Sequence, residues 1–331
     1  MKITRKLICS FFALIIAVSF AACGKKAVDG KTIGIAKFVK HDALDAVEKG
    51  IQDELADSGY KLNYDLQNAN ADANTSASIA NKFVSEKVAV AVGIATPTAQ
   101  SLVNSIKDIP IVFSAVTDPV SAGLISTIDM GENNVTGVSD LTPVKAQIMF
   151  LNKLKPIKRL GHIYSSHEDN ATALAKITKK ACEDLGIEFV ETTVTNSSEV
   201  KQAALTIADK VDAIYVSTDN TVISAISSIC EVAAAKNIPV MSADPSSAIN
   251  NDVFAAWGFD YYKMGRATGK MIKEILDGKK PNTIPIKFMT DPADIDLLIN
   301  LDVANKLGIE VSDTMIKNAN KIIKDGKMTQ R

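Results

Sequence analysis

The chain has 331 residues, of which 47% are hydrophobic and 23% are charged, and its formal net charge is −1. This length is sufficient for two domains that each bury a core. A near-neutral charge provides no positive field for nucleic acid and no field that would attract an acidic polymer, so the composition argues against both kinds of partner.

The first 30 residues have the pattern of an export signal followed by a tether. Basic residues precede an almost wholly apolar run over residues 7–20, and two alanines then precede Cys23, as in the lipobox of a bacterial lipoprotein. The alternative is an uncleaved membrane anchor, but the apolar run is shorter than the ~20 residues that a spanning helix needs. We therefore expect a signal peptide over 1–22, lipidation of Cys23 and a tether over 23–30.

After the tether, the hydrophobic pattern alternates between strands and helices. Apolar runs of strand length are typical of parallel strands that are buried on both faces, and apolar residues three and four positions apart form helical stripes. In chain order, strands are expected over 32–38, 62–66, 88–92 and 109–113, with helices beginning at Asp42, Ser76 and Thr96. This alternation predicts an α/β lobe with a parallel sheet.

A second copy of the same pattern follows. Two segments of the chain each place Ile-Pro before a strand and Asp-Pro after it. The prolines of the two Ile-Pro pairs, Pro110 and Pro239, are 129 residues apart, and two glycines of upstream strands, Gly34 and Gly161, are 127 residues apart. The sequence therefore predicts an α/β fold of two similar Rossmann-like lobes with parallel sheets.

The remaining segments are expected to complete the two lobes. If the lobes pair as the duplication suggests, the strand after Asn250 returns to lobe 1. Lobe 1 then comprises residues 31–140 and 254–288, and lobe 2 comprises residues 141–253 and 289–331. The chain would cross between the lobes three times, which makes a three-segment hinge that permits closure around a ligand in the interlobe cleft.

Two loops of lobe 1 follow neighbouring strands at their carboxyl ends, where ligands bind in open α/β sheets. Thr96 and Pro97 begin a helix in the first loop, and Ser114 and Thr117 belong to the second. Hydroxyls beside exposed backbone N–H groups suit a carboxylate ligand. Helix capping by Thr96 and Thr117 is the structural alternative.

The equivalent loops of lobe 2 carry acidic residues. Glu168, Asp219 and Asp244 are candidates for binding an α-ammonium group, which needs an anionic partner before it can be buried. Asp219 and Asn220 are the stronger candidates, because a capping role explains either residue but not the pair. Asp244 precedes a proline and Asn170 could cap a helix, so structural roles are the alternatives for these two residues.

The sequence contains no recognisable catalytic or metal-binding pattern, so we expect no enzymatic activity, no cofactor and no bound metal. His41, His162 and His167 lack metal-ligand spacing, and no nucleophile motif is present. His41 and His167 nevertheless lie in loops on the expected binding side. Cys182 and Cys230 lie in predicted helices, either as buried small hydrophobic residues or as a disulfide.

Several motifs in order carry a family resemblance. They are KHDALD (40–45), IATPTAQ (94–100), IVFSAVTDP (111–119), NNVTGVSD (133–140), STDNTV (217–222) and GFDYYKMGRATG (258–269). Together they resemble the ABC-transporter substrate-binding proteins of the tryptophan/tyrosine-type family, and the resemblance extends from Lys31 to about Ile316.

The resemblance implies a type I periplasmic-binding fold and a tethered, non-enzymatic receptor that delivers a small solute to an ABC permease. More distantly, residues 114–119 are similar to the loop that grips the carboxylate in branched-chain amino acid receptors. That similarity implies that Ala115 offers its backbone and Thr117 its hydroxyl and N–H, while Asp219 and Asp244 face the ammonium group.

The family also favours an amino acid with an aromatic side chain, and candidates for an apolar wall are Phe38, Tyr164, Trp257 and Phe259. The receptor would be a monomer without a nucleic-acid partner. Two alternatives stay open: a ligand-sensing domain of the same fold that serves another membrane protein, and import of a solute that is not an amino acid. A DNA-binding regulator of this fold would carry a DNA-binding segment in place of the signal peptide.

Overall fold

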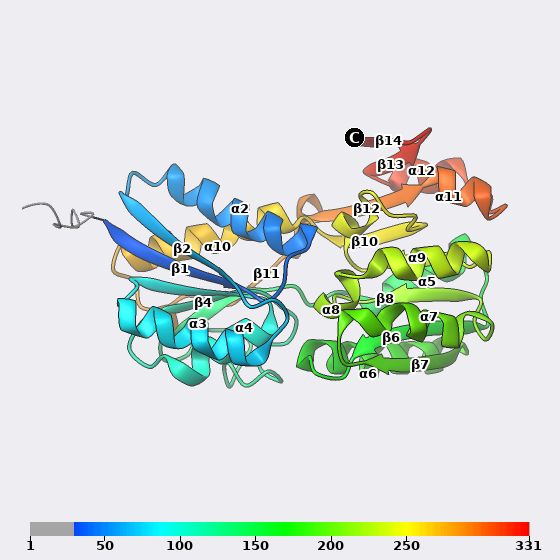
Figure 1. The fold of residues 1–331 in the computed structure, drawn as a ribbon. Helices are drawn as coiled ribbons and strands as arrows, with labels where there is room; N and C mark the ends of the chain where they lie inside the picture. Colours follow the sequence, from blue (N-terminus) through cyan, green and yellow to red (C-terminus); the bar gives the residue numbers. More distant parts are fainter. Residues whose placement is uncertain (1–29, 331) are drawn as a thin grey trace, which may run out of the picture.

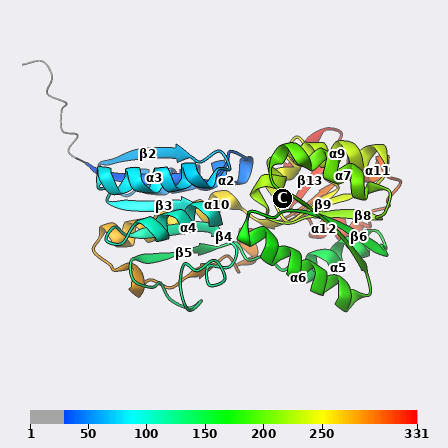
Figure 2. The same ribbon diagram turned by 60° about the horizontal axis from the view of Figure 1, so that its bottom comes forward.

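The computed structural model describes residues 30–330 and arranges them in two lobes that lie end to end. Figure 1 shows lobe 1 on the left and lobe 2 on the right, each with a central sheet between layers of helices. The view in Figure 2 shows the same two separate bodies with a narrow junction between them. The carboxyl ends of the central strands of both lobes therefore face this junction.

Lobe 1 is built on a six-stranded sheet with the order β11-β5-β4-β3-β1-β2, in which each neighbouring pair is parallel. The strands are β1 (Lys31–Lys37), β2 (Leu62–Asn68), β3 (Val90–Ile94), β4 (Ile111–Val116), β5 (Val135–Ser139) and β11 (Lys287–Phe288). Every residue of β3, β4 and β5 is buried, as expected for parallel strands that helices cover on both faces.

Helices pack on both faces of this sheet (Figure 1). They are α2 (Asp42–Ala56) and α10 (Tyr261–Leu276) on one face, and α3 (Ala73–Glu86) and α4 (Thr96–Ser105) on the other. Glycines allow α2 and α10 to approach closely, because a Cβ atom on Gly265 would lie 2.2 Å from the carbonyl oxygen of Val47. This contact holds α10, which enters from the other lobe, against the first helix of the described chain.

Lobe 2 is built on an eight-stranded sheet with the order β14-β13-β12-β10-β9-β8-β6-β7. Its strands are β6 (Arg159–Ser165), β7 (Glu188–Val194), β8 (Ala213–Val216), β9 (Val240–Ser242), β10 (Ala255–Phe259), β12 (Ile295–Asn300), β13 (Lys321–Lys324) and β14 (Lys327–Gln330). Its helices are α5 (Val144–Leu154), α6 (Asp169–Leu185), α7 (Val200–Ala208), α8 (Asn220–Ile223), α9 (Ile226–Ala235), α11 (Leu301–Lys306) and α12 (Asp313–Asn318). The pairs from β7 to β10 are parallel, whereas β12 runs antiparallel to β10.

The two lobes repeat one topology. The order β2-β1-β3-β4-β5 in lobe 1 corresponds to the order β7-β6-β8-β9-β10 in lobe 2. The prediction of two similar α/β lobes with parallel sheets is confirmed. The C-terminal strands β12, β13 and β14 extend the second sheet beyond the repeated unit.

The expected boundary at residue 254 is wrong for one strand. β10 belongs to the sheet of lobe 2, where Ala255 pairs with Met241 of β9 and with Ile299 of β12. The duplication explains this result, because β10 is the counterpart of β5, which also completes the parallel part of its own sheet. Pairing with β9 also needs a shorter loop than a return to lobe 1. The chain crosses into lobe 1 only at Asp260, before α10 begins.

Three segments connect the lobes: residues 140–143 between β5 and α5, Asp260 between β10 and α10, and residues 289–294 between β11 and β12. Such short connections at the ends of rigid elements are where two lobes can rotate relative to one another. The interlobe junction is therefore a hinge of three segments.

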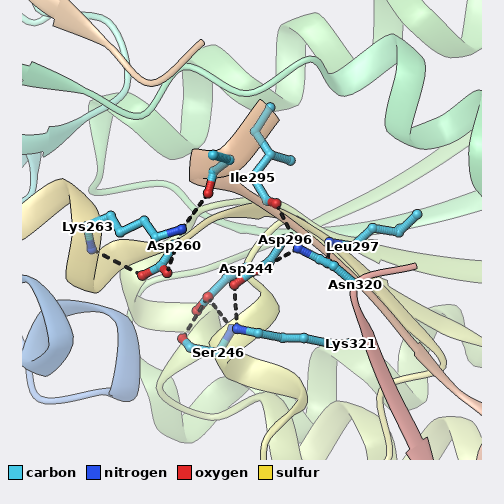
Figure 3. A network of polar contacts seen from close by, with 10 residues as sticks. Asp244, Ser246, Asp260, Lys263, Ile295, Asp296, Leu297, Asn320 and Lys321 are labelled. Atoms are coloured by element: carbon cyan, nitrogen blue, oxygen red, sulfur yellow. Dashed lines mark hydrogen bonds and ion pairs between the residues drawn. The ribbon is translucent and has the colours of Figure 1, made fainter. Parts of the chain in front are cut away.

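Polar contacts hold the second and third segments together, as Figure 3 shows. The backbone N–H of Asp260 donates to the carbonyl oxygen of Asp294 at 2.9 Å, and the Asp260 carboxylate accepts from the backbone N–H of Lys263 at 3.1 Å. Next to them, the buried carboxylate of Asp296 pairs with Lys321 of β13. These two hinge segments are thus one connected unit on the lobe 2 sheet.

Candidate functional site

A cavity lies between the lobes at the carboxyl ends of their strands. The space between the atoms there, counted together with its opening to solvent, is about 310 Å³. Lobe 1 and the hinge contribute His41, Ala43, Leu44, Ala115, Asp140 and Tyr261, and lobe 2 contributes Asn170, Thr218, Asp219, Asn220, Ile223 and Asp244. Among the residues predicted from sequence, the structure brings Ala115, Asn170, Asp219, Asn220 and Asp244 together here.

The lobe 1 side of the cavity has a strained backbone. Ala95, after β3, has φ +78° and ψ +157°, and Ala115, in a bulge at the end of β4, has φ +55°. These are conformations that non-glycine residues rarely adopt, and such residues cluster at functional sites because the surrounding structure must hold them. The backbone N–H of Ala95 donates to the carbonyl oxygen of Ser114 at 2.9 Å, which joins the two loops.

Thr96 does not cap its helix, contrary to the structural alternative. The N-cap of α4 is Ala95, which makes no side-chain cap, and Pro97 occupies the first turn. The Thr96 hydroxyl is buried and has no hydrogen-bond partner within the protein. Thr96 and Pro97 do not line the cavity themselves, but Thr96 begins the helix that follows the strained residue Ala95.

Ser114 and Thr117 are not at the cavity either, because other buried groups take their hydroxyls. The Ser114 hydroxyl lies 2.7 Å from the hydroxyl of Thr268 on α10. The Thr117 hydroxyl donates to Oδ1 of Asp140 at 3.1 Å. Both hydroxyls, predicted to hold a ligand carboxylate, therefore hold β4 against α10 and against the first hinge segment.

Glu168 has a full set of hydrogen-bond donors from its own lobe and does not line the cavity. Its Oε1 accepts from the backbone N–H of Thr221 at 2.9 Å and from the Thr221 hydroxyl at 2.6 Å. Its Oε2 accepts from Nδ2 of Asn220 at 2.6 Å and from Nδ2 of Asn170 at 3.4 Å. The carboxylate therefore orients both amides that line the cavity.

Asp219 and Asp244 both cap helical turns and both line the cavity. Asp219 accepts from the backbone N–H groups of Val222 at 3.0 Å and of Ser165 at 2.6 Å. Burial, with the charge of Glu168 as a further cause, raises the pKa of Asp219 well above its ordinary value. Burial likewise raises the pKa of Asp244 to about 6. Carboxyl groups in this state gain from a cationic ligand that replaces their lost hydration.

Two other residues of lobe 2 that line the cavity have buried polar atoms that make no hydrogen bond within the protein. The Asn170 amide donates to Glu168 and to the carbonyl oxygen of Thr218, so its Oδ1 remains a buried acceptor without a partner. The Thr218 hydroxyl is also buried without a partner. Buried polar groups normally find hydrogen bonds, and their absence here indicates a ligand-binding surface.

The sequence interpretation missed Asp140, in the first hinge segment, and Tyr261, the first residue of α10 directly after the second hinge segment. The Tyr261 hydroxyl donates to Oδ2 of Asp140 at 3.1 Å, and burial raises the pKa of Asp140 to about 6. Both residues lie in motifs that carried the family resemblance, NNVTGVSD and GFDYYKMGRATG. Their position at the ends of β5 and β10, where the chain leaves each sheet, is the signal that could have identified them.

Direct contacts also join the lobes across the cavity. Nε2 of His41 lies 3.4 Å from Oδ1 of Asn220, and Nε2 of Gln100 donates to Oδ2 of Asp169 at 2.7 Å. Burial lowers the pKa of His41 to about 4, so its imidazole is neutral at pH 7. Side chains of the two lobes are therefore in contact at two places in this arrangement.

The remaining sequence candidates lie elsewhere. The aromatic residues Phe38, Tyr164, Trp257 and Phe259 do not line the cavity, and its apolar part comes from Ala43, Leu44 and Ile223. Cys182 and Cys230 are buried free thiols, which decides against a disulfide between them. Over residues 30–330, no group of three or more His, Cys, Asp or Glu side chains is arranged to hold a metal ion.

A two-lobed α/β fold with a polar cavity at its hinge is the fold of type I periplasmic binding proteins. The chain belongs to the family of ABC transporter substrate-binding proteins, whose family model matches residues 32–323. Members of this class are extracytoplasmic receptors, and their partner is an ABC permease. The homologues of this chain are substrate-binding proteins rather than enzymes.

Two individual members of known name are similar to this chain over most of its length. A tyrosine-binding protein from Clostridioides difficile is 36% identical over 285 residues, which cover 85% of this chain and 81% of that protein. A Streptococcus pneumoniae ABC domain in complex with L-Trp is 33% identical and superposes with a TM-score of 0.85, covering 89% of this chain and 100% of that chain.

A third comparison concerns the arrangement of the lobes. The ligand-free, open structure of a Clostridium difficile substrate-binding protein with adhesive properties is 35% identical and has a TM-score of 0.65, covering 86% of this chain and 96% of that chain. Its identity is close to that of the L-Trp complex, whereas its TM-score is much lower. The two lobes of this chain are therefore arranged more nearly as in the L-Trp complex.

The predicted export signal, including Cys23, lies outside the described residues. Within the described part of the chain, the helices are too short or too polar to cross a membrane.

The hydrogen bond from Thr117 to Asp140 predicts a stability effect. In Thr117→Val, the buried Asp140 carboxyl group loses one of its two hydroxyl donors at nearly constant side-chain volume. We expect unfolding to become easier by about 1–3 kcal/mol in urea titrations. Thr206→Val, on an exposed helical surface, is the matched control and should change stability by less than about 0.5 kcal/mol. Equal stability of the two variants would show that this hydrogen bond does not stabilise the hinge.

Proposed function

We propose that this receptor binds an α-amino acid with an aromatic side chain, tryptophan or tyrosine, as a monomer, and delivers it to an ABC permease. One observation carries the proposal. The cavity brings the buried carboxyl groups of Asp219 and Asp244 from lobe 2 together with the strained loop at Ala115 from lobe 1, and the carboxyl group of Asp140 lies beside that loop. The named relatives, which bind tyrosine and L-Trp, support the choice of solute.

The ammonium group of the ligand would bind on the acidic side. Asp219 and Asp244 are buried acceptors on lobe 2, and Oδ1 of Asn170 adds an acceptor without a partner. A buried cation needs an anionic partner to offset its lost hydration, and hydrogen bonds to charged groups are stronger than neutral ones. Asp140 extends this acidic surface to the hinge.

The carboxylate group of the ligand would bind at the loop of Ala115, which lines the cavity next to the first turn of α4. The leading N–H groups of a helix have no partner inside the helix, and they attract anions. The unpartnered hydroxyl of Thr96 lies in this turn, and Ala115 comes from the adjacent loop. The side chain of the ligand would then contact Ala43, Leu44 and Ile223 and the ring of Tyr261.

Ligand binding would shift the receptor towards the closed arrangement. Residues from both lobes and from the first hinge segment line one cavity, so a ligand in it would contact both lobes only when they are closed. A ligand that binds the closed form more tightly increases its population in proportion to that difference in affinity. The permease partner would recognise the closed form.

A thermal-shift screen of residues 30–331 against all amino acids, small peptides, sugars and nucleosides tests the proposed function. L-tryptophan or L-tyrosine should give the largest increase in melting temperature, because a ligand at a hundredfold excess over its Kd stabilises the fold by about 2.7 kcal/mol. A sugar or nucleoside that shifts the melting temperature while every amino acid fails would contradict the assignment.

A variant pair locates the site in the same assay. Asp219→Asn preserves the cap of α8 but removes the charge, so the shift given by the amino acid should shrink strongly. Asp209→Asn, on the exposed surface of lobe 2, should keep the full shift.

Amino acid binding should also depend on pH. The raised pKa values of Asp140 and Asp244, about 6 in the unliganded protein, mean that these groups hold protons at pH 5 which an ammonium ligand must displace. Affinity should therefore rise from pH 5 to pH 7, by up to about tenfold per pH unit for each proton released. His41, with its pKa near 4, is neutral throughout this range.

The folding stability of the unliganded protein should change with pH in the opposite direction to the ligand affinity. Because these carboxyl groups have a higher pKa in the folded than in the unfolded protein, their contribution to stability is lost as pH rises from about 4 to about 7.

For the ligand affinity, calorimetric titration at three pH values, in buffers of different ionisation enthalpy, measures both the affinity and the release of protons. An affinity that stays constant between pH 5 and pH 7 would exclude these carboxyl groups from ammonium binding.

We also propose that Cys23 carries the lipid that anchors the receptor outside the cell membrane. The sequence pattern at residues 7–23 supports this assignment. Metabolic labelling with a radioactive fatty acid should mark the wild-type protein and not Cys23→Ser, which should be released from the membrane fraction. A labelled Cys23→Ser protein would refute the assignment.

A further inference from the structure

His41 lines the cavity, and one nitrogen of its ring, Nδ1, is buried without a hydrogen-bond partner. The residue precedes α2, where its extended backbone (φ −157°) places the side chain among the cavity-lining residues of lobe 1. Its Nδ1 is buried and makes no hydrogen bond within the protein, whereas Nε2 lies 3.4 Å from Oδ1 of Asn220. What Nδ1 can bind depends on which ring nitrogen carries the proton.

The orientation of the Asn220 amide decides this question. Nδ2 of Asn220 donates to Oε2 of Glu168 at 2.6 Å, and the same carboxylate accepts from Thr221 and Asn170. A carboxylate with four donors acts as an acceptor only, so the amide nitrogen of Asn220 must face Glu168. The amide oxygen of Asn220 therefore faces His41.

An amide oxygen accepts and cannot donate, so Nε2 of His41 must carry the hydrogen. A neutral imidazole has one N–H group, and the other nitrogen is then an acceptor with a free lone pair. Burial keeps this imidazole neutral. Through Asn220, Glu168 thus makes Nδ1 of His41 a hydrogen-bond acceptor.

Part of the wall of the same cavity is apolar. Ala43 and Leu44 follow His41 on α2, and Ile223 follows Asn220 by one turn on α8, and all three line the same cavity. The carboxyl groups that suit an ammonium group belong to Asp140, Asp219 and Asp244. A neutral acceptor within an apolar wall suits a neutral donor carried on a largely apolar group.

We propose that Nδ1 of His41 accepts a hydrogen bond from the side-chain donor of the ligand, an indole N–H or a phenol O–H. His41 is then a specificity-determining residue that separates tryptophan and tyrosine from phenylalanine, and Asn220 and Glu168 are its positioning residues. This inference rests on the proposed amino acid function. A ligand without the donor would leave Nδ1 buried and unpaired, which disfavours its binding.

Two ligand pairs test the inference on the wild-type protein. The first is L-tryptophan against 3-benzothienyl-L-alanine, in which sulfur replaces the indole N–H without added bulk, and the second is L-tyrosine against L-phenylalanine. Calorimetric titration should show about 10- to 100-fold tighter binding of the donor-bearing member of the pair that fits the cavity. Equal affinities within both pairs would overturn the inference while leaving the proposed function intact.

The variant His41→Phe keeps a ring of similar size and removes the acceptor. Its affinity for the donor-bearing ligand should fall about 10- to 100-fold, its affinity for the donor-free analogue should stay within about twofold, and the ratio between them should approach one. A loss that is the same for both ligands would assign His41 to the amino acid backbone and overturn the inference. The melting temperature of the unliganded variant shows whether it folds, and the wild-type ligand pairs test the inference without any variant.

Asn220→Ala tests the positioning role. Without the amide oxygen, the proton of His41 is free to occupy either nitrogen, so the preference for the donor-bearing ligand should weaken but not vanish. An unchanged preference would contradict the role of Asn220. If no amino acid binds the wild-type protein, the proposed function and this inference fall together.

Discussion

The lobe 2 wall of the cavity depends on one buried carboxylate, that of Glu168. Its four donors include the amide nitrogens of Asn170 and Asn220, which turns both amide oxygens away from it. One oxygen is left as a buried acceptor at the cavity, and the other faces His41 across the interlobe boundary. A charge that does not line the cavity thereby sets the hydrogen-bonding pattern of the surface that does. Removal of a single donor from such a network is costly, because the others polarise around the same charge.

The two lobes contribute to the cavity by different physical means. Lobe 2 supplies side-chain acceptors such as Asp219 and Asp244, each held by backbone N–H groups at the start of a helical turn. Lobe 1 supplies a strained backbone at Ala95 and Ala115 and the first turn of α4. This division matches the two charged ends of an amino acid. In the proposed function each lobe would hold one end, so that neither lobe alone would provide a complete site.

The sequence predicted the parts of the site that follow from local order. A residue in the loop after a buried parallel strand lies at the edge of the sheet that faces the cavity, which is why Asp219 and Asp244 were predicted, whereas Ala115 was predicted through the family resemblance. Ser114 and Thr117 occupy similar positions, but Thr268 of α10 and Asp140 of the hinge compete for their hydroxyls. Contacts between distant segments of this kind leave no periodic signal. The same limit explains the misplaced strand β10, whose partner sheet depends on loop length and pairing rather than on its own residues.

The hinge and the cavity share the side chain of Asp140, so a ligand that closes the lobes, as proposed, would contact the hinge itself. Asp140 of the first crossing segment and Tyr261, which follows the second crossing segment, line the cavity and are hydrogen-bonded to each other. Thr117 ties Asp140 to the loop that carries Ala115. A cation bound beside Asp140, as proposed, would therefore act on the connection between the lobes directly, without a relay through either core. Since coupling is reciprocal, any contact that favours the closed hinge must also favour the bound ligand.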